Sequence, residues 1–287
     1  MKPILIIGAT GTVGRQVIQE LSARGVPVRA LCRNPDSAAL PPQVEIVRGD
    51  LTVPATLEPA LADIAAVFLV WTAPAAAVPP ALEKILSRAT RIVFLSAPHQ
   101  TAHPFFQQPN PVARLHAEIE RQIQASGVPW TFLRPGMFAS NVRGWWTAQI
   151  RVGDIVRWPY SEAETAPIHE RDVATVGVRA LCDAAHQGKQ YVLTGPQPLT
   201  HREQVNIIAD RLGRPLRFEE ISPDDARREL LTIMPAPAIE MLLNAWAATI
   251  GHPALVTSEF AQVTGTPPRT FRDWVIEYAT EFHRVTK

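Results

Sequence analysis

A strand that runs directly into a glycine-rich turn constrains this chain more than any other feature. Residues Ile4–Ile7 form a continuous apolar run, and Gly8-Ala9-Thr10-Gly11-Thr12-Val13-Gly14 follows at once. Val17, Ile18 and Leu21 then recur at helical spacing. In dinucleotide-binding βα units, the first glycine permits the tight turn, the second lets the backbone approach the pyrophosphate, and the third lets the helix pack on the strand. The sequence therefore predicts a phosphate site at this helix N-terminus, the alternative being a turn that only connects strand to helix.

Short apolar runs alternate with helical patterns over the first 135 residues, which is typical of parallel strands joined by crossover helices. The runs are continuous rather than alternating, so burial on both faces of a sheet is expected. The predicted strands are Ile4–Ile7, Val26–Cys32, Val44–Val47, Ala65–Val70, Ile92–Leu95 and Trp130–Leu133. The expected fold class is α/β, a doubly wound parallel Rossmann sheet.

The order of elements is less regular beyond residue 135. Residues 222–250 and 267–284 have helical patterns with apolar residues on one side. We predict an NAD(P)-binding Rossmann domain over residues 1–150, to which the chain returns around 168–195. Residues 151–287 are predicted to form a smaller, mainly helical and discontinuous substrate-binding region.

Composition excludes several classes of function. A formal net charge of +1 gives no field that would recruit nucleic acid or an anionic membrane, and no apolar stretch reaches the roughly 18 residues that span a bilayer. The two cysteines, Cys32 and Cys182, form no CxxC pattern, which fits a reducing cytoplasm. His99 and His103 lie in an irregular loop without an accompanying carboxylate or thiol, so no metal site is predicted.

The end of the second predicted strand determines which nicotinamide cofactor is favoured. NAD enzymes usually place an acidic residue there, against the ribose hydroxyls. This strand ends instead in Arg33-Asn34, and the guanidinium could bind a 2′-phosphate, which favours NADP over NAD. The alternative is a solvated surface arginine. Asp50 and Leu51 are placed to flank the adenine, although Asp50 could equally be a loop cap.

Several motifs together resemble the NmrA-like group of atypical short-chain dehydrogenase/reductases. They are the GxxGxxG spacing of the turn, Arg33-Asn34-Pro35, Gly49-Asp50-Leu51, residues 126–136 (SGVPWTFLRPG) and residues 167–174 (PIHERDVA). The resemblance implies a Rossmann domain, a smaller C-terminal domain and a substrate cleft. It also implies either reduction of quinones, carbonyls or enones, or binding of the dinucleotide without turnover by a redox sensor.

The resemblance also implies positions around the cofactor. Trp71 and Thr72 correspond to the segment that passes beneath the ribose and pyrophosphate, and Pro135 and Phe138 to the pocket wall beside the nicotinamide. The predicted cofactor residues are Gly8, Thr10, Gly11, Thr12, Val13, Gly14, Arg33, Asp50, Leu51, Trp71, Thr72, Ser96 and Pro135.

The usual catalytic pair of short-chain dehydrogenases, a Tyr with a Lys four residues later, is absent from the sequence. His116 lies on the helix where related proteins carry the residue that faces the nicotinamide ribose, and it could donate a proton near neutral pH. Glu120, or else Glu118, could hold its tautomer, because i,i+4 residues share a helix face. Ser96 ends the fifth strand, where its hydroxyl could bind ribose or a substrate carbonyl. The alternatives are an ordinary helical ion-pair network for His116 and a loop cap for Ser96.

The resulting main hypothesis is an NADPH-dependent oxidoreductase that reduces an apolar carbonyl, quinone or enone by hydride transfer. Phe138, Trp145 and Trp146 are predicted to contact this small-molecule substrate, but the tryptophans could equally belong to the core between the domains. The alternative function is a non-catalytic NADP(H)-binding redox sensor. Amphipathic helices could serve a homodimer or pack within a monomer.

Overall fold

The computed structural model describes residues 1–284, which group into two compact units. The first unit comprises Met1–Ala97, Pro111–Pro135 and Glu170–Val192. The second comprises Pro98–Asn110, Gly136–His169 and the chain from Leu193 onward. The grouping by contacts therefore does not follow a single cut at residue 150. The assignment of residues 151–287 to substrate binding remains a prediction.

A seven-stranded sheet with the order β3-β2-β1-β4-β5-β6-β9 forms the centre of the first unit. The strands are β1 (Ile4–Ile7), β2 (Val28–Cys32), β3 (Glu45–Arg48), β4 (Ala66–Val70), β5 (Ile92–Leu95), β6 (Trp130–Pro135) and β9 (Lys189–Leu193). Pairing from β3 through β6 is parallel throughout. In register, Ile6 lies between Ala30 and Phe68. This order, which reverses beside β1, confirms the predicted doubly wound Rossmann fold.

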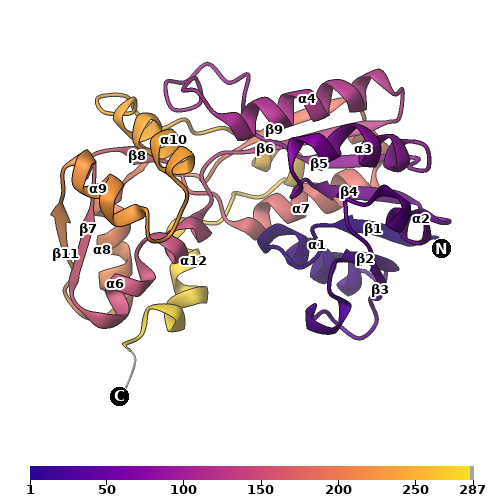
Figure 1. Ribbon diagram of the computed structural model, residues 1–287. Coiled ribbons are helices and arrows are strands. Elements are labelled where there is room, and N and C mark those ends of the chain that lie inside the picture. The colour runs from indigo at the N-terminus through magenta and orange to yellow at the C-terminus, as the bar shows by residue number, and fades with distance from the viewer. Residues whose placement is uncertain (285–287) are drawn as a thin grey trace. The chain divides into compact units, whose positions relative to one another are not determined.

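Helices cover both faces of this sheet, which is why its strands are apolar without alternation. Leu5 and Ile7 pack in one cluster with Leu82 and Ile119, whereas Phe68 meets the opposite layer. Figure 1 shows α3 (Val78–Leu86) and α4 (Pro111–Ala125) on one side, and α1 (Thr12–Ala23) and α7 (Glu170–Cys182) on the other. The short α2 (Glu58–Leu61) joins the α3 layer.

The second unit is mainly helical. Its helices are α5 (Val142–Trp145), α6 (Thr147–Val152), α8 (His201–Leu212), α9 (Pro223–Leu230), α10 (Ala236–Ala247), α11 (Glu259–Thr264) and α12 (Phe271–Tyr278). Two small sheets complete it: β7 (Ile155–Trp158) pairs in parallel with β11 (Arg217–Glu220), and β8 (Glu164–Thr165) pairs antiparallel with β10 (Leu199–Thr200). Trp146, Trp158, Trp246 and Trp274 lie in its core. Large aromatic side chains thus supply much of the apolar area that holds these helices together.

Helix ends in the second unit follow their sequence signals. Thr200 and Glu203 form a reciprocal capping box at the start of α8, and Gly213 ends that helix in the left-handed conformation. Thr270 and Asp273 form a second capping box at the start of α12. Such caps satisfy the free N–H groups of a helix's first turn, so they fix where each helix begins.

Gly14 generates the first prediction. A Cβ atom there would lie 2.2 Å from the carbonyl oxygen of Gly8, which is backbone and cannot rotate away. Gly14→Ala should lower the free energy of unfolding by at least about 2 kcal/mol, as overpacking does, when measured by urea denaturation. Gly144→Ala is the control, because a Cβ atom there meets nothing within 4 Å. Equal stability of the two variants would contradict the proposed close approach.

Candidate cofactor and active site

The glycine turn has the backbone geometry that phosphate binding requires. Gly8 has a φ of +85°, and a Cβ atom there would lie 2.6 Å from the Cβ of Val70. The Gly11 amide donates to the Gly8 carbonyl at 3.1 Å. Gly11 is also the N-cap of α1, where no side chain caps the helix and no acidic residue lies in the first turn. The first amides of α1 and the positive end of its dipole are thus available to a phosphate.

A cavity of about 430 Å³ lies where β1, β2, β3 and β4 end. Its lining comes from residues 7–11, residues 31–33, residues 49–52, and Val70 with residues 72–74. In doubly wound sheets, ligands bind at these carboxyl ends. Predicted cofactor residues in this lining are Gly8, Thr10, Gly11, Arg33, Asp50, Leu51 and Thr72. The size, the glycine turn and the helix N-terminus together fit a bound dinucleotide.

Six predicted cofactor residues lie outside this cavity lining: Thr12, Val13, Gly14, Trp71, Ser96 and Pro135. Thr12 is exposed in the first turn of α1, while Val13 is buried beneath the turn. Trp71 is only 6% exposed, packs in the core cluster of the first unit, and donates its indole N–H to the carbonyl of Ala73 at 2.7 Å. Pro135 is buried at the end of β6. Trp71 therefore supports the segment Thr72–Pro74 that lines the cavity.

Arg33 and Asp50 both line this cavity, but only Asp50 has hydrogen-bond partners among residues 1–284. Arg33 is exposed and has no hydrogen bond or ion pair to any of residues 1–284. The Asp50 carboxylate accepts hydrogen bonds from the amide and the hydroxyl of Thr52, both at 2.8 Å. These bonds, and to a lesser degree the charge of Arg33, hold the pKa of Asp50 below its usual range. Asp50 therefore caps its own loop as an anion, and Arg33 keeps its guanidinium donors for another acceptor.

Arg15 connects the glycine turn to the loop that follows Arg33, a contact that sequence analysis missed. Its Nε donates to the carbonyl of Thr10 in the glycine turn at 3.0 Å. Its Nη1 and Nη2 donate to the carbonyls of Ala39 and Ala38, each at 2.9 Å. Ala39 itself has a φ of +46°, which is unusual for a residue other than glycine. Arg15 thus fixes the loop that follows Arg33 to the turn that opens α1.

The positive charge of Arg15 also acts on the thiol of Cys32, which lines the cavity. Burial raises the pKa of the Cys32 thiol, and the positive charge of Arg15 opposes that rise. The thiol is therefore neutral at physiological pH and presents an apolar surface to the ligand.

Two of the residues predicted for catalysis, Ser96 and His116, are each connected to β5. Ser96 follows this strand, is 5% exposed, and donates its amide to the Leu133 carbonyl of β6 at 2.7 Å. Its hydroxyl oxygen is buried and has no hydrogen-bond partner among residues 1–284. His116 of α4 meets the Phe94 ring of β5 edge to face, with 5.3 Å between ring centres. Ser96 is thus tied to β5 by its place in the chain, and His116 by its contact with Phe94.

Glu120 has a buried partner that its position on the helix did not reveal. Its carboxylate accepts two hydrogen bonds from Arg134 of β6, at 2.9 and 2.5 Å, and both side chains are 4% exposed. Glu118 instead binds Arg121 at 2.8 and 2.6 Å, which lowers the pKa of Glu118 to about 2. These contacts assign Glu120 to fastening α4 onto β6. Its predicted role in orienting His116 remains a prediction.

The predicted substrate residues belong to the second unit. Phe138 is half-buried and forms an isolated bridge with Ile168. Trp146 is fully buried in the core, which is the alternative that the sequence left open. Trp145 is only partly buried and lines a cavity of this unit. Of the two tryptophans, only Trp145 therefore presents surface to a ligand.

Neither a metal-binding group of side chains nor a membrane-spanning helix is found among residues 1–284. Among residues 1–284, no group of three or more His, Cys, Asp or Glu side chains is arranged to bind a metal ion. Within the same residues, every helix is too short or too polar to cross a bilayer.

The turn, the sheet and the cavity define a dinucleotide-binding protein of the Rossmann class. Residues 8–184 match the NAD(P)H-binding family model. The chain belongs to this family and, within it, to the NmrA-like atypical short-chain dehydrogenase/reductases.

Relatives of known activity extend this assignment. The chain is 38% identical to the (4-alkanoyl-5-oxo-2,5-dihydrofuran-3-yl)methyl phosphate reductase of Streptomyces griseus, over 97% of this chain and 99% of the relative. It is 31% identical to the NAD(P)H azoreductase of Xenophilus azovorans, again over 97% and 99%. The protein is thus an NAD(P)H-dependent oxidoreductase, which confirms the predicted enzyme class rather than the sensor.

Solved structures match the fold over nearly the whole chain. The Citrobacter triphenylmethane reductase complexed with NADP(H) aligns with a TM-score of 0.80 at 20% identity, over 96% of this chain and 99% of that one. The quinone oxidoreductase QOR2 of Escherichia coli complexed with NADPH aligns with a TM-score of 0.80 at 22% identity, over the same shares. At these identities the likeness establishes the fold.

Arg15 generates the second prediction. Arg15→Ala should weaken NADPH binding about tenfold, because the loop after Arg33 loses its two bonds to the guanidinium and must be ordered on binding. Arg15→Lys should rescue only part of the loss, since an ammonium cannot reproduce the planar fork. Calorimetric titration measures both. Arg24→Ala is the control, because Arg24 lies at the far end of α1. An unchanged NADPH affinity in Arg15→Ala would refute the role of this contact.

Proposed function

We propose that the protein uses NADPH in preference to NADH to reduce an apolar, conjugated acceptor such as a quinone, an enone or an aromatic ketone. The observation that carries the cofactor preference is Arg33, which lines the dinucleotide cavity with an exposed guanidinium and has no partner among residues 1–284. A 2′-phosphate would give it a charge-assisted, two-pronged contact that a ribose hydroxyl cannot match. Asp50, in the same cavity lining, forms no ion pair with Arg33, and its carboxylate accepts hydrogen bonds from Thr52.

The conjugated acceptor follows from what the active site lacks. A simple ketone concentrates the developing charge on one oxygen, so its reduction needs a strong proton donor such as the missing Tyr/Lys pair. A conjugated acceptor delocalises that charge over several atoms, so its reduction can proceed with a weaker proton donor. The name of the Streptomyces relative's substrate denotes a ring alkene conjugated with an oxo and an alkanoyl group, and the Xenophilus relative is an azoreductase. Both names fit polarised double bonds that accept a hydride at one end.

Ser96 and His116 then have distinct roles. When bound, NADPH supplies the hydride. The Ser96 hydroxyl donates a hydrogen bond to the acceptor oxygen, which stabilises the charge that develops there. His116 donates the proton that completes the reduction, because an imidazolium ring carries two N–H donors.

Cofactor preference gives the third prediction. Arg33→Ala should raise the dissociation constant of NADPH tenfold to a hundredfold, the loss expected for about 1.5–3 kcal/mol of hydrogen bonding to a charged group. The dissociation constant of NADH should change less than about threefold. Arg88→Ala is the matched control, because Arg88 is an exposed arginine of the same unit outside the cavity lining. If both cofactors weaken equally, Arg33 does not recognise the 2′-phosphate.

The catalytic roles give the fourth prediction. Ser96→Ala should lower kcat against a naphthoquinone at least about tenfold. It should leave the thermal midpoint unchanged or slightly raised, because the buried hydroxyl has no partner among residues 1–284 to lose. His116→Ala should lower kcat about a hundredfold while NADPH affinity stays nearly constant. Unchanged turnover in either variant would remove that residue from the mechanism.

The acceptor class is tested by NADPH oxidation against a panel of quinones, enones, aromatic ketones and simple aliphatic ketones. Turnover is expected with the conjugated compounds and should be at least about a hundredfold slower with the aliphatic ketones. Tight NADPH binding without oxidation by any compound on the panel would overturn the proposed reaction.

A further inference from the structure

His201 lies in the core of the second unit, and the steps proposed above assign no role to it. It is the first residue of α8 and is 1% exposed. Its ring meets that of Trp246 edge to face with 5.0 Å between ring centres, and that of Trp146 with 6.1 Å. The imidazole is thus packed against two indole rings that are themselves fully buried.

The hydrogen bonds of this ring define its tautomer. Nδ1 of His201 lies 3.3 Å from the carbonyl oxygen of Pro159, and because a carbonyl only accepts, Nδ1 carries the proton and donates it. Nε2 is then a lone pair, buried and without a partner among residues 1–284. The indole nitrogens of Trp146 and Trp246 are themselves donors without an acceptor in this part of the chain. A proton added at Nε2 would therefore create a buried charged donor that the neighbouring indoles cannot satisfy.

The start of α8 also holds a strained turn in place. Tyr160 in this turn has a φ of +53°, which is unusual for a residue other than glycine. The His201 amide donates to the Ala163 carbonyl and the Arg202 amide to the Ser161 carbonyl, each at 3.2 Å. Together with the bond from Nδ1, these contacts fasten residues 159–163 to α8. Separation of the turn from α8 would expose His201.

Glu220 of β11 supplies the charge that acts on this imidazole. Its carboxylate accepts a hydrogen bond from the Ser161 hydroxyl at 2.5 Å, so it is held at the turn. Arg202, the next residue of α8, donates instead to Glu162 at 3.2 Å. The attraction of Glu220 for an imidazolium therefore opposes the effect of burial.

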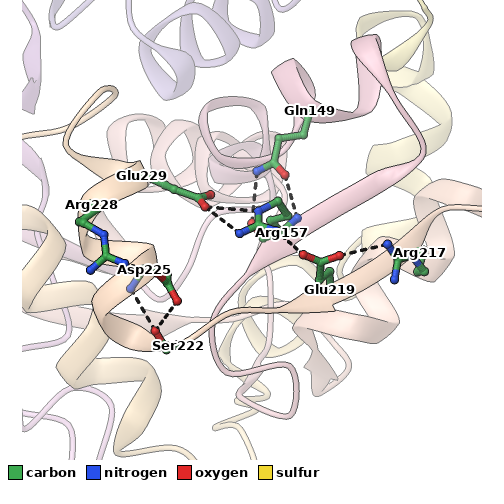
Figure 2. A network of polar contacts seen from close by, with 8 residues as sticks. All are labelled: Gln149, Arg157, Arg217, Glu219, Ser222, Asp225, Arg228 and Glu229. Carbon is green, nitrogen blue, oxygen red and sulfur yellow. Dashed lines mark hydrogen bonds and ion pairs between the residues drawn. The ribbon is translucent and has the colours of Figure 1, made fainter.

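Several other charged side chains on the elements around His201 have partners elsewhere. Figure 2 shows Arg157 of β7, two residues before Pro159, bound to Glu219 and Glu229. The others are Glu203, bound to Thr200 in the cap of α8, Glu240 of α10, bound to Arg227, and Arg143 of α5, bound to Glu281, while Arg151 of α6 is exposed. These pairs leave burial as the dominant influence on the ring.

The energetic consequence has a definite sign. Burial lowers the pKa of His201 to about 4, although backbone hydrogen bonding and the charge of Glu220 oppose that shift. The positive end of the α8 dipole also disfavours a cation at the first helical residue. In the unfolded chain the imidazole titrates near 6.5. As the pH falls from 6.5 to about 4, the unfolded chain binds a proton that the folded protein does not, and the free energy of unfolding decreases.

We propose that His201 is a pH-sensitive switch in the second unit: the neutral ring holds residues 159–163 to α8, and its protonation requires the tryptophan core to open. Because Nε2 takes up the proton only in the opened unit, no path from solvent into the folded core is needed. The linkage involves neither NADPH nor an acceptor, so it is independent of the proposed reaction.

Urea unfolding of the full chain, followed by tryptophan fluorescence at about pH 7.5 and about pH 5, tests the proposal. The unfolding constant should be about thirtyfold larger at the lower pH through this group alone. His201→Asn keeps a donor near the position of Nδ1 and His201→Phe keeps a ring, but neither titrates. Both should reduce the pH dependence at least about tenfold, whatever their stability at the higher pH. His252→Asn, an exposed histidine of the same unit, is the control and should keep the full dependence.

Heteronuclear NMR of the imidazole nitrogens examines the unmodified protein, and so does not depend on a variant that folds. Among the eight histidines, at least one should remain neutral with its proton on Nδ1 at about pH 5. The proposal is overturned if a folded His201 variant reduces the pH dependence less than about tenfold, or if every imidazole of the folded protein is protonated at about pH 5.

Discussion

The close approach of α1 to the Gly8 carbonyl is the constraint on which the rest of the first unit depends. With 2.2 Å between that oxygen and a would-be Cβ of Gly14, only glycine lets the helix begin this near the strand. The same approach turns the first amides of α1 toward the cavity at the carboxyl ends of β1, β2 and β4. Phosphate binding and the packing of the sheet are therefore consequences of one contact.

Two arginines near this cavity, Arg15 and Arg33, have different structural roles. Arg15 donates to three backbone carbonyls and so ties the glycine turn to the loop after Arg33. Arg33 has no partner among residues 1–284 and lines the cavity itself. In the sequence both are simply arginines close to a glycine turn. Their difference arises because Ala38 and Ala39 fold back onto Arg15, a contact between residues 23 and 24 positions apart.

The partner of Glu120 and the different burial of Trp145 and Trp146 also could not be read from the sequence. Helical spacing correctly put His116 and Glu120 on one helix, but it could not reveal that Arg134, 14 positions further on, binds Glu120 in the interior. Adjacent Trp145 and Trp146 look equivalent in the sequence. Trp146, which lies between α5 and α6, packs in the core, whereas Trp145 at the end of α5 lines a cavity.

The sequence by itself determined the Rossmann sheet, the glycine turn and the NmrA-like family, because each depends on local signals: continuous apolar strands, glycines at fixed spacing and helix-ending residues. Tertiary structure alone decided which charges are paired. It gave Glu120 to Arg134 and Arg157 to two glutamates, and it left Arg33 and the Ser96 hydroxyl without partners among residues 1–284. Pairing of this kind depends on distances between segments remote in sequence, which no local pattern encodes.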